Sequence, residues 1–232
     1  MLLSPDEWEI VRLSLKVSGV AVGVTLPISF ALAKLLARAR FPGKTLVDAI
    51  VHLPLVLPPV VTGWLLLIGF GLRGPIGGWL HDWFGLTLIF RWTGAALAAG
   101  IMALPLMVRA MRLSIEAVDR RLEGAARTLG ASRSRVFLTI TLPLAMPGVL
   151  AGAVLGFARS IGEFGATITF VSNIPGETRT LPIAIYAALQ VPGSDAVVTR
   201  LAVISVILSL GALILSGMLS RRAGGGRGGH VL

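Results

Sequence analysis

Five long apolar runs constrain the fold of this sequence more than any other feature. They occupy residues 11–37, 46–70, 94–111, 148–171 and 196–219. A helix needs about 20 predominantly apolar residues to cross the hydrocarbon core of a bilayer. Charged residues make up 14% of the 232-residue chain, against roughly one quarter in a soluble domain. The sequence therefore predicts an all-α integral membrane protein, with one transmembrane domain over residues 1–220.

The number of spans depends on the segments between these runs. Five spans are predicted, and six if a further segment crosses the membrane. The apolar run 181–189 is too short to span, so we expect it at the interface or inside the bundle. The first run follows acidic residues where a signal peptide would be basic, which favours a retained span. The glycine-rich tail, residues 221–232, is predicted to be disordered.

The distribution of lysine and arginine predicts the orientation of the chain. Cytoplasmic loops of membrane proteins carry an excess of these residues. With the N-terminus outside, 14 of the 21 basic residues lie on the cytoplasmic side. They are Lys34, Arg38, Arg40, Lys44, Arg109, Arg112, Arg120, Arg121, Arg127, Arg133, Arg135, Arg221, Arg222 and Arg227. The N-terminus and residues 172–195 are then external, whereas residues 112–146 and the C-terminus are cytoplasmic.

Residues 112–146 carry a helical pattern in spite of their cytoplasmic position. One face repeats apolar residues at helical spacing: Leu122, Ala125, Ala126 and Leu129. Asp119 can cap this helix and Gly130 can end it in a left-handed conformation. Ser132 can cap a second helix, which we expect Pro143 to interrupt. Because the apolar face is mostly alanine, another backbone can approach it closely. We predict a docking helix for a protein partner; the alternative is a connector packed against its own bundle.

This segment resembles the EAA loop of the membrane subunits of type I ABC importers, written E-A-A-x3-G-x9-I-x-L-P. The matching residues are Ala125, Ala126, Gly130, Ile140, Leu142 and Pro143. The family's glutamate position is Gly124 here, and Glu123 stands one residue earlier. The resemblance implies that this loop, with Leu122 and Leu129, couples the chain to an ATP-hydrolysing subunit.

Longer stretches narrow the resemblance. The sequences LPLVLPPVVTG, LPLMVRA and FARSIGEFGATITFVSNIPGETRTLP are similar to the membrane subunits of molybdate importers, and more loosely to sulfate and thiosulfate permeases. The resemblance implies a homodimer in a bacterial inner membrane, two cytoplasmic ATPase subunits that bind ATP and Mg, and an external binding protein that delivers the oxyanion. The alternatives are a sulfate, thiosulfate or tungstate permease, or a secondary transporter or channel without ATP. Five spans form no obvious inverted repeat, which disfavours a secondary transporter.

Two features inside the runs are candidates for the translocation path. Arg159 and Glu163 lie four residues apart and should share a helix face. Ionisable groups in a span face the bundle interior or an aqueous path, so they either line the anion path or form an ion pair that locks packing. Pro58 and Pro59 must break backbone hydrogen bonding, which is tolerated at membrane depth only beside protein or a water-filled cavity. We expect this break to line the path.

Glycines four residues apart, at positions 148, 152 and 156, form a row in the fourth run. Such rows permit close helix contact in lipid. We therefore expect this face to meet another helix, within the subunit or across a dimer.

Enzymatic chemistry on this chain is not predicted. There are no cysteines and only three histidines, which lie far apart, so neither a metal site nor a catalytic triad can be assembled. The Gly43-Lys44-Thr45 triplet has Arg38 where a phosphate-binding loop requires glycine. No cofactor is expected on the chain itself. Its basic residues fall between apolar runs, as topology signals do, so nucleic acid is not an expected partner.

Overall fold

The computed structural model describes residues 3–224, which contain helices and no strands. Four helices are long: α1 (Pro5–Arg38), α5 (Trp92–Glu116), α8 (Leu142–Ile161) and α11 (Asp195–Gly224). The shorter elements are α2 (Lys44–Val56), α3 (Pro59–Phe70), α4 (Pro75–Phe84), α6 (Arg120–Thr128), α7 (Arg133–Val136), the π-helical turn η1 (Phe137–Thr141), α9 (Gly165–Val171) and α10 (Leu181–Leu189). The predicted all-α membrane fold is confirmed.

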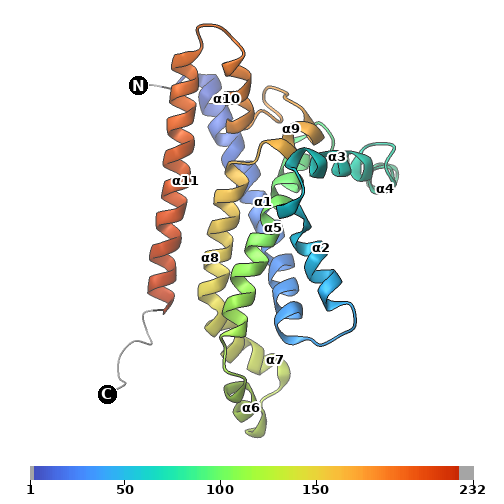
Figure 1. Cartoon of the computed structure of the whole chain (residues 1–232), viewed down its shortest axis with the longest axis vertical. Helices are drawn as coiled ribbons and strands as arrows, with labels where there is room; N and C mark the ends of the chain where they lie inside the picture. The colour runs from blue at the N-terminus through green and yellow to red at the C-terminus, as the bar shows by residue number, and fades with distance from the viewer. Residues whose placement is uncertain (1–2, 225–232) are drawn as a thin grey trace.

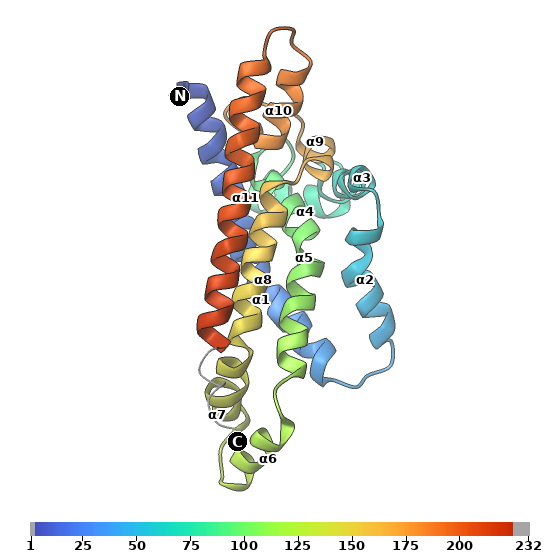
Figure 2. The same ribbon diagram turned by 60° about the vertical axis from the view of Figure 1, so that its left-hand side comes forward.

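The long helices run side by side, with α5 between α8 and the shorter α2 (Figures 1 and 2). Helix α5 packs against both α1 and α8, and α8 packs against α11. Two thirds of the most apolar stretch of α5 is buried, but only 6% of that of α11. An apolar surface this exposed suits contact with lipid rather than water. The glycine row of α8 meets α5 as expected: a Cβ atom at Gly148 would lie 2.2 Å from the Cβ of Ser114.

The second apolar run, predicted as one span interrupted by prolines, is bent more sharply than a kink. It forms two helices, α2 and α3, bent by 115°. The residue before a proline is forced towards extended backbone, and Leu57 and Pro58 both precede one. Their ψ angles are 141° and 133°. The 13 residues of α2 reach only about 20 Å, less than the hydrocarbon thickness of about 30 Å.

The fourth apolar run also differs from its predicted bounds of 148–171. The helix starts earlier, passing without a stop from Arg133 to Ile161, and a break at Gly162–Phe164 separates it from α9. Pro143 does not interrupt this helix. It lies in the first turn of α8, directly after η1, and the wider turn of η1 changes the hydrogen-bond register before the missing N–H is reached.

The ends of the bundle agree with the predicted division into two sides. The start of α1 and helix α10 lie at one end, whereas α6, α7 and the end of α11 lie at the other (Figure 1). Helix α10 has nine residues, about 14 Å, and therefore does not span. Helix α11 is described to Gly224, so residues 221–224 of the predicted tail are helical. Residues 225–232 lie outside the described chain.

Candidate functional site

The predicted helix–turn–helix in the central segment is present at one end of the bundle. The carboxylate of Asp119 accepts a hydrogen bond from the backbone N–H of Arg121 at 2.9 Å and caps α6. Gly130 has a φ angle of +83°, the left-handed conformation that ends helices. The Ser132 hydroxyl caps α7 by accepting from the Arg135 N–H at 3.3 Å. Local capping chemistry therefore sets the shape of this segment.

The apolar face of α6 does not pack against the bundle. No residue of α6 is buried. Leu122 is 50% exposed and Leu129 is 88% exposed; Ala125 is exposed, and Ala126 is only partly covered. A connector that packs on its own bundle would bury these side chains. An exposed apolar face with arginines beside it is typical of a surface that another protein covers.

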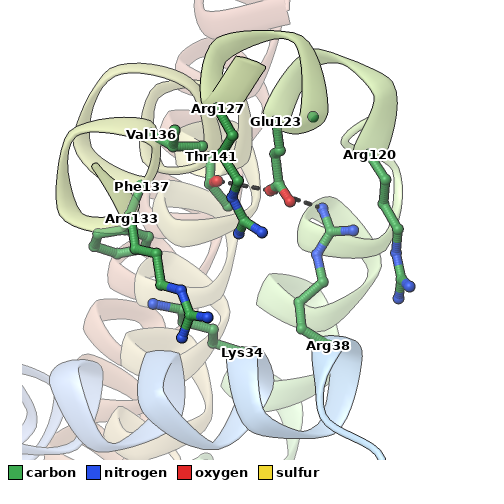
Figure 3. A pocket seen from close by; sticks show the side chains of 10 residues that line it. Lys34, Arg38, Arg120, Glu123, Arg127, Arg133, Val136, Phe137 and Thr141 are labelled. Atoms are coloured by element: carbon green, nitrogen blue, oxygen red, sulfur yellow. Dashed lines mark hydrogen bonds and ion pairs between the residues drawn. The ribbon is translucent and has the colours of Figure 1, made fainter. Parts of the chain in front are cut away.

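Glu123 points the other way, into the bundle (Figure 3). Its Oε1 atom accepts a hydrogen bond from the Thr141 hydroxyl at 2.7 Å and from Nη2 of Arg38 at 3.3 Å. Arg38 Nη2 also donates to the carbonyl oxygen of Val118 at 3.1 Å. Glu123 thus ties α6 to both α1 and η1. Glu123, Arg38 and Thr141 line a cavity between α1 and the loop. Gly124 lines it too, and a Cβ atom at Gly124 would meet nothing within 4 Å.

The last part of the motif lies where η1 joins α8, away from the apolar face of α6. Ile140 and Leu142 are partly buried, and Pro143 is exposed in the first turn of α8. These residues therefore belong to the join between η1 and α8 rather than to the exposed face of α6.

The breaks of the two interrupted runs lie against each other. Helices α3 and α9 are in contact. A Cβ atom at Gly165 would lie 2.7 Å from the Cβ of Pro59, and one at Gly63 would lie 2.6 Å from the carbonyl oxygen of Ala166. Pro58 and Pro59 are exposed. The structure therefore brings together the predicted path prolines and the chain around Glu163.

Arg159 and Glu163 form an ion pair, with Nη1 and Oε2 2.6 Å apart. They do not share one helix face as predicted, because α8 ends at Ile161 and Glu163 lies in the break. There the other carboxylate oxygen, Oε1, accepts from the Ala166 N–H at 2.9 Å and caps α9. The side chain of Glu163 is 2% exposed and that of Arg159 is 26% exposed. Glu163 holds the break together, and about a quarter of the Arg159 side chain stays exposed.

Sequence reasoning missed the partners that hold these sites. Thr141 and Arg38 anchor Glu123, yet Arg38 counted only as a topology signal. Arg112 on α5 contacts Asp48 on α2 at 3.1 Å, across 64 positions of sequence. Spacing along one helix carries no signal for contacts between helices. Within residues 3–224, no group of three or more His, Asp or Glu side chains is placed to hold a metal ion.

The sequence is similar to a transporter family and to several permease proteins. The family described as "Binding-protein-dependent transport system inner membrane component" matches residues 23–225. The molybdenum transport system permease protein ModB of Escherichia coli K12 is 59% identical over 221 residues, which cover 95% of this chain and 96% of that protein. ModB of Haemophilus influenzae is 57% identical over 212 residues, covering 91% and 93%. The E. coli sulfate transport system permease protein CysT is 34% identical over 221 residues, covering 94% and 78%.

Solved structures agree on the fold. The chain matches a bacterial ABC transporter involved in import of the acidic polysaccharide alginate with a TM-score of 0.73 at 19% identity, covering 95% of this chain and 80% of that one. It matches the MetNI methionine ABC transporter in inward-facing conformations with the same score and identity, covering 96% and 99%. The chain belongs to the family of binding-protein-dependent transport system inner membrane components, among the type I ABC importer permeases related to the molybdenum transporters.

Proposed function

We propose that this chain is the permease subunit of an ATP-driven importer and forms the transmembrane path for molybdate. Identity of 57–59% to two molybdenum permeases over more than nine tenths of the chain supports the substrate. A sulfate permease is the second candidate, because the CysT relative is 34% identical over a similar length. The chain acts as a homodimer, with α6, α7 and the end of α11 in the cytoplasm and the start of α1 outside.

The exposed apolar face of α6 is the observation on which the mechanism rests. An ATPase subunit that covers Leu122, Ala125, Ala126 and Leu129 would remove these side chains from water. ATP and Mg bind to that partner, and the permease itself carries out no hydrolysis. Displacement of α6 reaches α1 and α8 through the bonds of Glu123 to Arg38 and Thr141.

The path itself is assigned to the crossing of α3 and α9. Backbone groups freed by the breaks at Pro58–Pro59 and Gly162–Phe164 need protein or water around them. Packing of these breaks against each other supports a position inside the assembly rather than in lipid. An external binding protein would deliver the oxyanion at the end of the bundle that holds the start of α1 and helix α10. This binding protein would supply most of the selectivity.

Reconstitution tests the function directly. The chain is purified with its ATPase, placed in proteoliposomes with the binding protein, and uptake of labelled molybdate is measured. We expect uptake that requires ATP and that unlabelled molybdate suppresses more strongly than sulfate. Stronger competition by sulfate would assign the second candidate, and uptake without ATP or ATPase would contradict an ABC permease.

A further inference from the structure

A basic cavity lies between the C-terminal end of α1 and the α6–α7 segment. Its volume is about 500 Å³, and its ionisable lining residues are Lys34, Arg38, Arg120, Glu123, Arg127 and Arg133. Figure 3 shows the side chains of Arg127 and Arg133 extending from the α6–α7 segment towards Lys34 and Arg38 on α1. Five cationic groups and one carboxylate thus face one space.

The charges of this cavity are not balanced by the protein. Glu123, the one carboxylate, already bonds to Arg38 and Thr141. Within the described chain, no carboxylate lies at ion-pair distance from Arg120, Arg127 or Arg133, whereas five ion pairs form outside the cavity. Like charges gathered without counter-ions repel one another and raise the local concentration of anions. The cavity therefore suits an anionic ligand.

The Arg38 side chain supplies a second, independent observation. Its Nε atom is buried and donates no hydrogen bond to any group of the described chain. Buried donors are seldom left unpaired, so each one needs an explanation. A guanidinium presents several N–H groups in a planar fork that matches the oxygens of a phosphate. Because Arg38 lines the cavity, a phosphate oxygen there is a partner of the right chemistry for its guanidinium, and it meets the buried Nε once the side chain turns towards the cavity.

The position of the cavity indicates the source of the phosphate. The apolar helix α1 ends at Arg38, which places the cavity at the level of lipid headgroups. On the part of α1 that leads away from the cavity into the bundle, Leu35 is 41% exposed and Ile28 is 50% exposed. These residues are seven positions apart and share one apolar face, about a quarter turn around α1 from Lys34 and Arg38. This neighbouring face can accept an acyl chain. A free phosphate ion would have no use for this face.

We propose that this cavity binds the phosphate group of an anionic phospholipid, with an acyl chain along α1. Basic pockets beside membrane helices are a recurrent form of lipid recognition. Assignment to the cytoplasmic leaflet rests on the orientation of the proposed function, but the lipid site itself does not. Bound lipid would brace the α6–α7 segment against α1.

The test measures binding of phosphatidylglycerol to the purified full-length chain by native mass spectrometry in detergent. Arg127→Gln/Arg133→Gln removes two lining cations, and Arg121→Gln/Arg135→Gln is the matched control, because it removes two exposed arginines from the same helices that do not line the cavity. Each cation at an anionic surface contributes roughly fivefold in affinity, so the cavity variant should bind about 25-fold more weakly. The control should bind as the wild type does.

Two further arms identify the ligand. Excess inorganic phosphate should not displace the bound phosphatidylglycerol. If phosphate does displace it, the cavity binds a soluble oxyanion as well as it binds the lipid, and the lipid site is overturned. Equal binding by wild type and both double variants would overturn the proposal outright. Release of the lipid on addition of the ATPase would also overturn the proposal, because the cavity would then belong to the interface with that partner. A thermal unfolding midpoint equal to that of the wild type shows that a variant is folded. If the double variant fails to fold, Arg127→Gln alone should lower the affinity for phosphatidylglycerol about fivefold.

Discussion

Arg159→Gln should destabilise the subunit by leaving a buried carboxylate without its cation. The Glu163 side chain is 2% exposed and 2.6 Å from Arg159. Breaking a buried ion pair costs about 3–5 kcal/mol. Two facts lower this figure here: Arg159 is 26% exposed, and the Ala166 N–H still donates to Glu163. We therefore expect a loss of about 2–3 kcal/mol, at or just below the lower end of that range.

The double change Arg159→Gln/Glu163→Gln should restore most of this stability. Replacing both members of a buried pair by neutral groups of similar volume is often nearly neutral. The introduced amide oxygen at position 163 can still accept from Ala166 and cap α9. In a double-mutant cycle, the coupling energy between Arg159 and Glu163 should then be about 2 kcal/mol, within the range for residues in direct contact.

The assay combines unfolding of the purified subunit in detergent with molybdate uptake by proteoliposomes. We expect Arg159→Gln to lower both quantities and the double change to recover both, because Glu163 is enclosed in the break. An Arg159→Gln subunit as stable as the wild type would refute the pairing argument. Recovery of stability without recovery of uptake would instead place Arg159 on the anion path.

The remaining predictions concern docking, topology and packing. Ala126→Leu should weaken copurification of the ATPase by overpacking a close contact, which costs about 1–3 kcal/mol. Gly130→Val should do the same through the left-handed turn, at about 1–2 kcal/mol, although a Cβ there meets no atom within 4 Å; normal association in both would make the loop a connector. Single cysteines at Ser4 and Ser134 should be labelled from opposite sides of intact cells, and labelling of both from outside would reverse the orientation. Gly148→Val should lower the thermal midpoint by forcing α8 away from Ser114, and an unchanged midpoint would contradict that contact.

Features governed by neighbouring residues could be predicted from the sequence. The limits of α6 follow from the Asp119 cap and the Gly130 turn, both found within a few residues of the helix they define. The glycine row of α8 predicted a close helix contact because spacing alone places Gly148, Gly152 and Gly156 on one face. In each case the chemistry that sets the structure lies within one or two turns of chain.

The direction of a helix after a break, and contacts between side chains far apart in the sequence, could not be predicted in this way. Pro58 and Pro59 predict a break, but the 115° angle of the bend depends on the packing of α3 against α9. The predicted helix face for Arg159 and Glu163 assumed a helix that continues beyond Ile161. Arg38 and Glu123 are 85 positions apart, so no periodicity relates them.

Two polar links at the ends of α8 connect the α6–α7 segment to the crossing of α3 and α9. At one end, Glu123 of α6 bonds to Thr141, the last residue of η1 before α8 begins. At the other, Arg159 in the last turn of α8 pairs with Glu163, which caps α9. The 20 residues between them form a helix of about 30 Å, packed along its glycine row against α5. Because a packed helix moves as a unit, we expect α8 to carry a displacement of α6 to α9.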